Sequence, residues 1–267
     1  MKTSDSRFRS LLLAVVVLLL LAGASAAAQA GEVSVYLKSG YFTWDEKLNG
    51  ASFVKETGAL FGAGVAHKGE VGGLNLAELA EVWGGSLNYD GHDLTNTTKI
   101  ESDTSYLGTR EEVSLGFRLP VTSSLSFEPF VGVGHKFWIR TRSGEDWNSI
   151  YTKLGVGSEV GVGAHTVFAK AGLLLPLYTR NHVSLASAGY SDVVTEPKSL
   201  PSAFAEAGVK RGAFALSVEY EGMRFGESDK VPTTRLSAIP GAVVQNNQAF
   251  QPDSEAHLFS LKLAYSF

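Results

Sequence analysis

The 267-residue sequence contains no cysteine, which excludes disulfides, thiolate metal sites and cysteine nucleophiles. It carries a net charge of −4 and has no basic stripe, so it lacks the cations that nucleic-acid binding requires. The histidines are scattered, and no pair on one strand face has metal-ligand spacing with carboxylate support. We therefore expect no metal, no cofactor and no nucleic-acid partner.

Long apolar runs are confined to the N-terminus. Three basic residues lie between positions 2 and 9, an unbroken apolar stretch follows from Leu11 to Leu21, and Ala28 and Ala30 form an A-x-A cleavage site. Beyond Gly31, no run reaches the roughly 18 apolar residues that a membrane-spanning helix needs. We predict a cleaved secretory signal peptide at residues 1–30. The alternative, a retained anchor, is disfavoured because the apolar core is short.

The chain after residue 30 lacks helical periodicity and instead alternates apolar and polar residues with period two. The final segment, from Glu255 to Phe267, shows this most clearly. One of its faces carries an apolar and aromatic set, namely His257, Phe259, Leu261, Leu263, Tyr265 and Phe267. A strand of this length, tilted by about 40°, crosses a bilayer.

The same alternation recurs often enough to predict about ten strands. They fall near residues 33–38, 61–66, 74–89, 112–119, 125–140, 153–162, 167–177, 203–210, 214–221 and 255–267. Within 74–89, Glu78 and Glu81 have opposite parity, which predicts a β-bulge. We predict an all-β fold for residues 31–267: a single transmembrane antiparallel up-and-down barrel of about ten strands, with eight or twelve as alternatives.

The connections between these strands alternate in length, as in outer-membrane barrels. Short links fall near residues 68–73, 120–124, 161–165 and 210–212. Longer polar links fall near residues 43–53, 90–105, 142–149, 179–199 and 226–254. An even strand number then places both chain ends at the periplasmic side and the long loops outside the cell.

A soluble β-sandwich would also alternate, so the composition of the polar face matters. This face combines many of the 29 glycines with single charges of both signs. Glycine is poorly suited to strands in general, but it makes room where large side chains fill a narrow barrel. The polar face therefore favours a barrel.

Two sets of residues resemble known outer-membrane proteins. The ending Leu261–Phe267 resembles the C-terminal insertion signal of Gram-negative outer-membrane proteins, in which Tyr265 and Phe267 would be the signal residues. Residues 89–91, 102–108 and 128–134 resemble small barrels described only as outer-membrane β-barrel domain proteins. This resemblance implies location in the outer membrane, contact with its lipid and lipopolysaccharide, and handling by periplasmic chaperones and the barrel-assembly machinery.

A ten-stranded barrel has a narrow interior, so the charges on its inner face must be paired or hydrated. They would either form a network of salt bridges that plugs the barrel or line a polar pore. The predicted lumen-lining charges are Lys38, Arg110, Glu112, Arg118, Glu128, Lys136, Arg140, Lys153, Glu159, Lys170, Glu206, Lys210, Glu219, Glu221 and Lys262. The four tryptophans lie near expected strand ends, where anchoring at the membrane interface would explain them.

Two motifs resemble catalytic groups of outer-membrane enzymes. Asp90 and His92 have the spacing of an Asp and a His in the omptin proteases, but the separate Asp pair of that family has no match here. His182, Ser184 and Glu196 resemble the residues of lipid A deacylases, although Leu185 replaces the Asn that follows the Ser.

We expect a monomeric barrel that is not an enzyme and has a structural or surface-recognition role through long extracellular loops. A narrow small-solute channel is the alternative, followed by a hydrolase.

Overall fold

A computed structural model describes residues 29–92, 98–235 and 246–267. Its wall consists of ten long strands, as the alternation predicted. They are β1 (Gln29–Leu48), β2 (Ala51–Val71), β3 (Leu74–His92), β4 (Lys99–Gly116), β6 (Leu125–Arg140), β7 (Glu145–Val162), β8 (His165–Val183), β11 (Ser202–Arg211), β12 (Phe214–Gly226) and β15 (Asp253–Ser266). The predicted signal peptide lies outside the described residues, except for positions 29 and 30.

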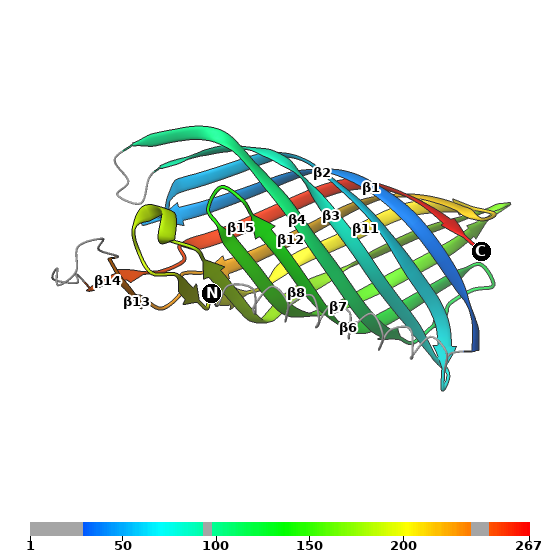
Figure 1. Ribbon diagram of the computed structural model, residues 1–267. Helices are drawn as coiled ribbons and strands as arrows, with labels where there is room; N and C mark the ends of the chain where they lie inside the picture. Colours follow the sequence, from blue (N-terminus) through cyan, green and yellow to red (C-terminus); the bar gives the residue numbers. More distant parts are fainter. Residues whose placement is uncertain (1–28, 93–97, 236–245) are drawn as a thin grey trace.

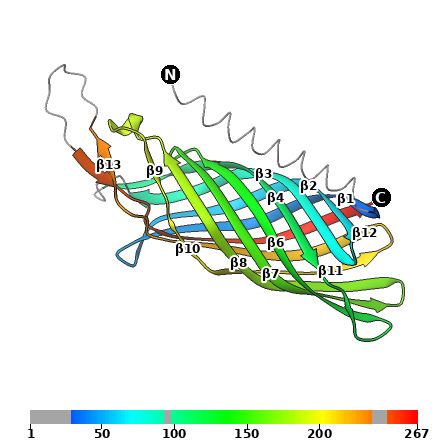
Figure 2. The same ribbon diagram turned by 90° about the horizontal axis from the view of Figure 1, so that it is seen from below.

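The wall strands form a closed antiparallel barrel in which each strand pairs with its neighbours along the chain (Figure 1). Closure is made by β15, which pairs with β12 on one side and with β1 on the other. The strands are strongly tilted relative to the barrel axis (Figure 2). Closure leaves no unpaired edge in the wall, and a structure that crosses lipid through strands requires this.

Short turns join the strands at one end of the barrel, here called the turn end. Gly72 and Gly73 connect β2 to β3 with φ values of 59° and 80°, a region that glycine adopts without strain. Similar turns at 163–164 and 212–213 connect the next hairpins, and residues 117–124 with the short strand β5 (Leu119–Pro120) connect β4 to β6. The predicted short links are therefore all at this end.

The opposite end, here called the loop end, holds fewer long loops than predicted. β1 and β2 continue to a two-residue turn at Asn49–Gly50, so the predicted long link at 43–53 is wrong. The predicted links at 90–105 and 142–149 are also too long, because β4 already begins at Lys99 and β7 at Glu145. The polar residues that suggested loops belong to strands that extend past the apolar part of the wall.

Two connections at the loop end are long, and they contact each other. Residues 184–201 contain a 3₁₀ turn (Ala186–Ala188), β9 (Val193–Thr195) and β10 (Lys198–Leu200). Residues 227–252 contain β13 (Val231–Thr234) and β14 (Asn246–Ala249), which pair with each other. The backbone N–H of Ser191 donates to the carbonyl of Thr234 at 2.8 Å, so the first loop is tied to the second.

The wall has an apolar outer face and a polar inner face. Leu37, Phe61, Leu107, Val131 and Phe259 are about half exposed or more on the outer face. An apolar surface that surrounds the whole wall is far larger than soluble monomers expose. Among the described residues, no helix is long and apolar enough to cross a membrane.

The predicted bulge at Glu78 and Glu81 does not occur, because β3 keeps one continuous register with both β2 and β4. Their opposite parity instead places them on opposite faces. Glu81 pairs in register with Gly64 and faces the lumen beside Tyr36, whereas Glu78 lies opposite His67 on the outer face.

Glycine should be required at one inner position of β8. A Cβ at Gly172 would collide with the carbonyl of Leu154 and approach the Cα of Gly155 to 2.6 Å. Because both obstacles are backbone atoms, Gly172→Ala should lower the unfolding free energy by about 1–3 kcal/mol. Urea titration in detergent, followed by tryptophan fluorescence, measures this.

The matched control is Gly157→Ala on the adjacent strand β7, where a Cβ would have no neighbour closer than 3.7 Å. This variant should unfold at the same urea concentration as the wild type. Equal midpoints for the two variants would contradict the close approach of β7 and β8.

Candidate functional site in the barrel lumen

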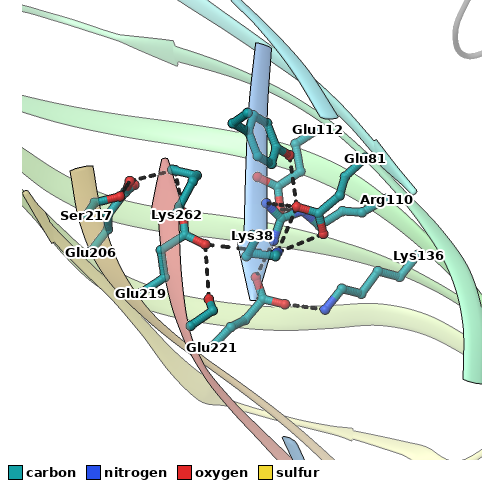
Figure 3. A network of polar contacts seen from close by, with 12 residues as sticks. Lys38, Glu81, Arg110, Glu112, Lys136, Glu206, Ser217, Glu219, Glu221 and Lys262 are labelled. Carbon is teal, nitrogen blue, oxygen red and sulfur yellow. Dashed lines mark hydrogen bonds and ion pairs between the residues drawn. The ribbon is translucent and has the colours of Figure 1, made fainter. Parts of the chain in front are cut away.

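A continuous network of ion pairs crosses the middle of the lumen (Figure 3). It contains six cationic and five carboxylate side chains, which are Lys38, Arg110, Lys136, Lys153, Lys170 and Lys262, and Glu81, Glu112, Glu206, Glu219 and Glu221. These side chains come from β1, β3, β4, β6, β7, β8, β11, β12 and β15. We call this set the central network.

Glu221 is the most connected carboxylate of the central network. It accepts from Lys136, from Arg110 Nη1 at 3.0 Å and from Lys153 at 3.3 Å. Lys153 also donates to Glu112 at 2.7 Å. One carboxylate on β12 therefore joins three strands from the other side of the barrel.

Glu81 forms a second junction. Lys38 donates to it at 2.7 Å, and the hydroxyl of Tyr36 donates at 2.9 Å. Arg110 Nη2 lies 3.8 Å from the same carboxylate and so links this junction to Glu221. All these groups are nearly excluded from solvent, which requires that each charge has a partner.

The network continues toward the turn end. Lys262 contacts both Glu219 and Glu206, and Lys170 donates to Glu206 at 2.7 Å. The hydroxyl of Ser217 donates to Glu206 at 2.8 Å. Figure 3 shows Glu206 of β11, Ser217 and Glu219 of β12, and Lys262 of β15 meeting at this point.

The strand that supplies no charge to the network, β2, supplies space. A Cβ at Gly64 would lie 2.5 Å from the ring of Tyr36, and one at Gly62 would lie 3.5 Å from Cε of Lys38. Glycine on the inner face thus lets long side chains of β1 lie across the neighbouring strand.

A small cavity adjoins the central network toward the loop end. Its volume is about 40 Å³, enough for one or a few water molecules. Lys38, Arg110 and Glu221 border one side, and Phe42, Met223 and Ala256 are among the residues that border the rest. The cavity therefore separates the charged layer from an aromatic layer.

The aromatic layer, here called the aromatic box, consists of Trp44, Trp138, Trp147 and Phe225. Their ring centroids lie 5.2–6.4 Å apart, and all four side chains are almost fully buried. The fourth tryptophan, Trp83, packs against the same buried cluster and borders the cavity. All four tryptophans are thus inside the barrel, so the prediction of interfacial anchoring was wrong.

Three carboxylates surround Arg140 beside the aromatic box. Arg140 donates to Glu46 and Glu145 at 2.6 Å each and to Glu56 at 2.8 Å. Its guanidinium also lies over the ring of Trp44, 4.7 Å from the centroid. Arg140, Glu46, Glu56 and Glu145 are called the outer cluster below.

The lumen-lining residues predicted from the sequence fall into three groups. Most belong to the central network, and Arg140 belongs to the outer cluster. The others lie near the turn end, where Arg118 is 3.7 Å from Glu159, Glu128 accepts from Asn75 at 2.5 Å, and Lys210 donates to Glu32. Arg118 and Glu159 are the more exposed of these, with side chains 61% and 45% exposed.

Five inner carboxylates that bind a cation were missing from the prediction, and one of them is Glu32, the partner of Lys210. Glu46 and Glu145 lie in segments that were interpreted as loops, Glu56 lies between a predicted loop and the next predicted strand, and Glu81 was obscured by the predicted bulge. Their parity was informative, because Glu46 lies an even number of residues after Lys38 on the same strand.

The two enzyme-like motifs do not assemble into the arrangements they resemble. Asp90 lies 3.3 Å from Lys99, and Nδ1 of His92 lies 3.3 Å from the carbonyl oxygen of Phe53. In the second motif, Ser184 donates to Asp192 at 3.3 Å and Glu196 accepts from Tyr178 at 3.1 Å.

His182 of the second motif has other neighbours. Its two ring nitrogens lie 3.6 Å from Asp146 and 3.9 Å from Asp192. Across residues 29–92, 98–235 and 246–267, no three His, Asp or Glu side chains are placed to hold a metal ion.

The fold is similar to that of outer membrane protease OmpT from Escherichia coli. The two chains align with a TM-score of 0.55 at 9% identity, over 89% of this chain and 96% of OmpT. The transport unit of the autotransporter AIDA-I from Escherichia coli gives a TM-score of 0.47 at 12% identity, over 88% and 90% of the two chains. The Pseudomonas putida toluene transporter TodX gives 0.36 at 9% identity, over 90% of each.

In sequence, no family model and no curated protein matches the chain. The closed ten-strand wall and the similarity to OmpT show that the chain has the fold of an outer-membrane β-barrel, as the sequence resemblance implied.

The central network should depend strongly on Glu221. Glu221→Gln would leave three buried cations with too little negative charge, so the unfolding free energy should fall by about 3–5 kcal/mol. Urea midpoints of the refolded barrel, read from the shift between folded and unfolded bands on gels, measure the loss.

Glu159→Gln is the control, because its contact with Arg118 is largely exposed and should contribute less than about 1 kcal/mol. A Glu221→Gln variant as stable as Glu159→Gln would show that the ion pairs of the network do not hold the wall together.

Proposed function

We propose that this protein resides in the outer membrane of a Gram-negative bacterium, where it is a closed barrel with a structural or surface-recognition role. The observation that carries this proposal is the filled lumen. The central network and the aromatic box occupy successive layers of the interior, and most of their side chains are buried. A barrel filled in this way is suited to rigidity and not to free passage of solutes.

Recognition is assigned to the loop end because the two long connections are ordered there by mutual contacts. Ser191 binds Thr233 and Thr234 across the two loops, and Asn181 donates to Gln251 at 2.8 Å. An ordered loop surface on a rigid wall is the usual way in which a barrel presents a binding surface.

Export and insertion are part of the same proposal. Residues 1–30 would direct secretion, and periplasmic chaperones and the barrel-assembly machinery would recognise Tyr265 and Phe267. Both side chains are exposed on the outer face at the turn end, where a folding factor would find them. The assembled protein would be a monomer that contacts lipid and lipopolysaccharide and has no enzymatic activity.

A narrow channel is the second candidate. It is favoured by one observation: every side chain of the central network, the aromatic box and the outer cluster belongs to a wall strand. Side chains can rearrange without separating the strands, so a filled lumen of this kind is able to open.

Conductance distinguishes the two candidates. The refolded mature chain should be silent in a planar bilayer, because paired charges and packed rings fill the lumen. The folded state of the protein is checked by the change in its electrophoretic mobility when the sample is heated. Discrete conductance openings from folded wild-type protein would contradict the closed barrel and support the channel.

The export part is tested by the mature N-terminus. Mass spectrometry of the protein from an outer-membrane fraction should give a chain that begins at Gly31. Replacing Ala28 and Ala30 by leucine should block cleavage, because the peptidase pocket accepts small side chains at these positions. Leucine at Ala22, directly after the apolar run, is the control and should leave cleavage unchanged. Cleavage that persists without Ala28 and Ala30 would contradict the assignment.

A further inference from the structure

The outer cluster contains more negative than positive charge. Glu46, Glu56 and Glu145 share a single guanidinium, and all four side chains are at least nine-tenths buried. The remaining donors to these carboxylates are neutral, since they are the indole N–H groups of Trp44 and Trp147 and the hydroxyl of Tyr106. Arg140 is therefore the one cation in direct contact with this group of three carboxylates among the described residues.

Arg140 connects opposite sides of the barrel. It extends from β6, and its carboxylate partners lie on β1, β2 and β7. In the closed order of ten strands, β1 and β7 are five positions apart, which is the largest separation possible. The guanidinium also lies over Trp44 of the aromatic box, so the cluster and the box are held together.

The aromatic box separates the loop end from the cavity. Along β1, Lys38 and Phe42 border the cavity, and Trp44 and Glu46 follow in the direction of the loop end. Along β12, Met223 borders the cavity and Phe225 follows in the box. Access to the cavity from the loop end thus leads past the outer cluster and the box.

We propose that Arg140 is the latch of a cation-selective gate at the loop end: when its carboxylate contacts break, the aromatic box opens and three glutamates line the entrance. A ring of carboxylates without a paired cation attracts cations and repels anions. A small cation that enters would take the place of the guanidinium. This inference rests on the closed lumen proposed above and adds the route by which the lumen opens.

Access to Ala256 tests the gate. Ala256 borders the cavity and is buried, and the sequence has no cysteine, so Ala256→Cys gives one reporter thiol behind the box. The probes are a cationic and an anionic methanethiosulfonate of similar size, applied to the refolded chain in liposomes. Mass spectrometry measures the rate of labelling.

With Arg140 present, the thiol should be almost unreactive. Adding Arg140→Gln should raise the labelling rate by at least about tenfold, because hydrogen bonds to charged groups shift an equilibrium by that factor or more. The labelling rate should rise more for the cationic probe than for the anionic one. Replacing Glu46, Glu56 and Glu145 by glutamine in the same background should abolish this preference.

Arg118→Gln is the matched control, because it removes the same charge from an exposed pair near the turn end and should leave labelling slow. If the thiol is reactive while Arg140 is intact, the closed lumen itself is wrong. If a folded Arg140→Gln protein labels as slowly as the control, the latch is wrong and the closed lumen stands.

Arg140→Lys covers the case in which Arg140→Gln fails to fold. Lysine keeps the charge but cannot reach three carboxylates with a planar fork, so labelling should be intermediate. A folded Arg140→Lys protein with no increase in labelling would overturn the proposal.

Discussion

Charges on the inner face of this barrel have to find partners within the barrel, and the rest of the structure depends on that constraint. The interior is too narrow to hydrate each charge separately, so an unpaired one would be strongly unfavourable. Glu221 illustrates the solution, because it binds Lys136, Arg110 and Lys153 from strands across the lumen. The glycines of β2 follow from the same need, since long side chains from other strands require the space that a Cβ would occupy.

How far the sequence predicts this fold depends on the range of the interaction. Period-two alternation is local, so it predicted the wall, the number of strands and the direction of most side chains. The identity of ion-pair partners is not local. Lys38 and Glu81 are 43 residues apart, and Arg110 and Glu221 are 111 apart. Their meeting depends on the register of every strand between them, and alternation alone does not set that register.

The errors at the loop end have one physical cause. Strands that extend beyond the apolar part of the wall carry polar residues on both faces, and this pattern resembles a loop. For this reason, the sequence did not predict that Trp44 and Glu46 on β1 and Glu145 on β7 face the lumen. Tryptophan adds to the ambiguity, because an indole stabilises both a membrane interface and a buried box in which its N–H has an acceptor. In the barrel, Trp44 and Trp147 donate to Glu46 and Glu145.

The balance of charge distinguishes the two layers of the lumen. The central network has nearly equal numbers of cations and carboxylates, so any rearrangement there breaks pairs on both sides. The outer cluster has three carboxylates and one cation, so all of its ion-pair attraction depends on the side chain of Arg140. Since the energy of a buried charge cluster is lowest when its net charge is small, the outer cluster is the weaker layer. The wall strands are hydrogen-bonded to a neighbour on both sides. The filling of the lumen therefore sets where the barrel can open, and in our proposal that place is the loop end.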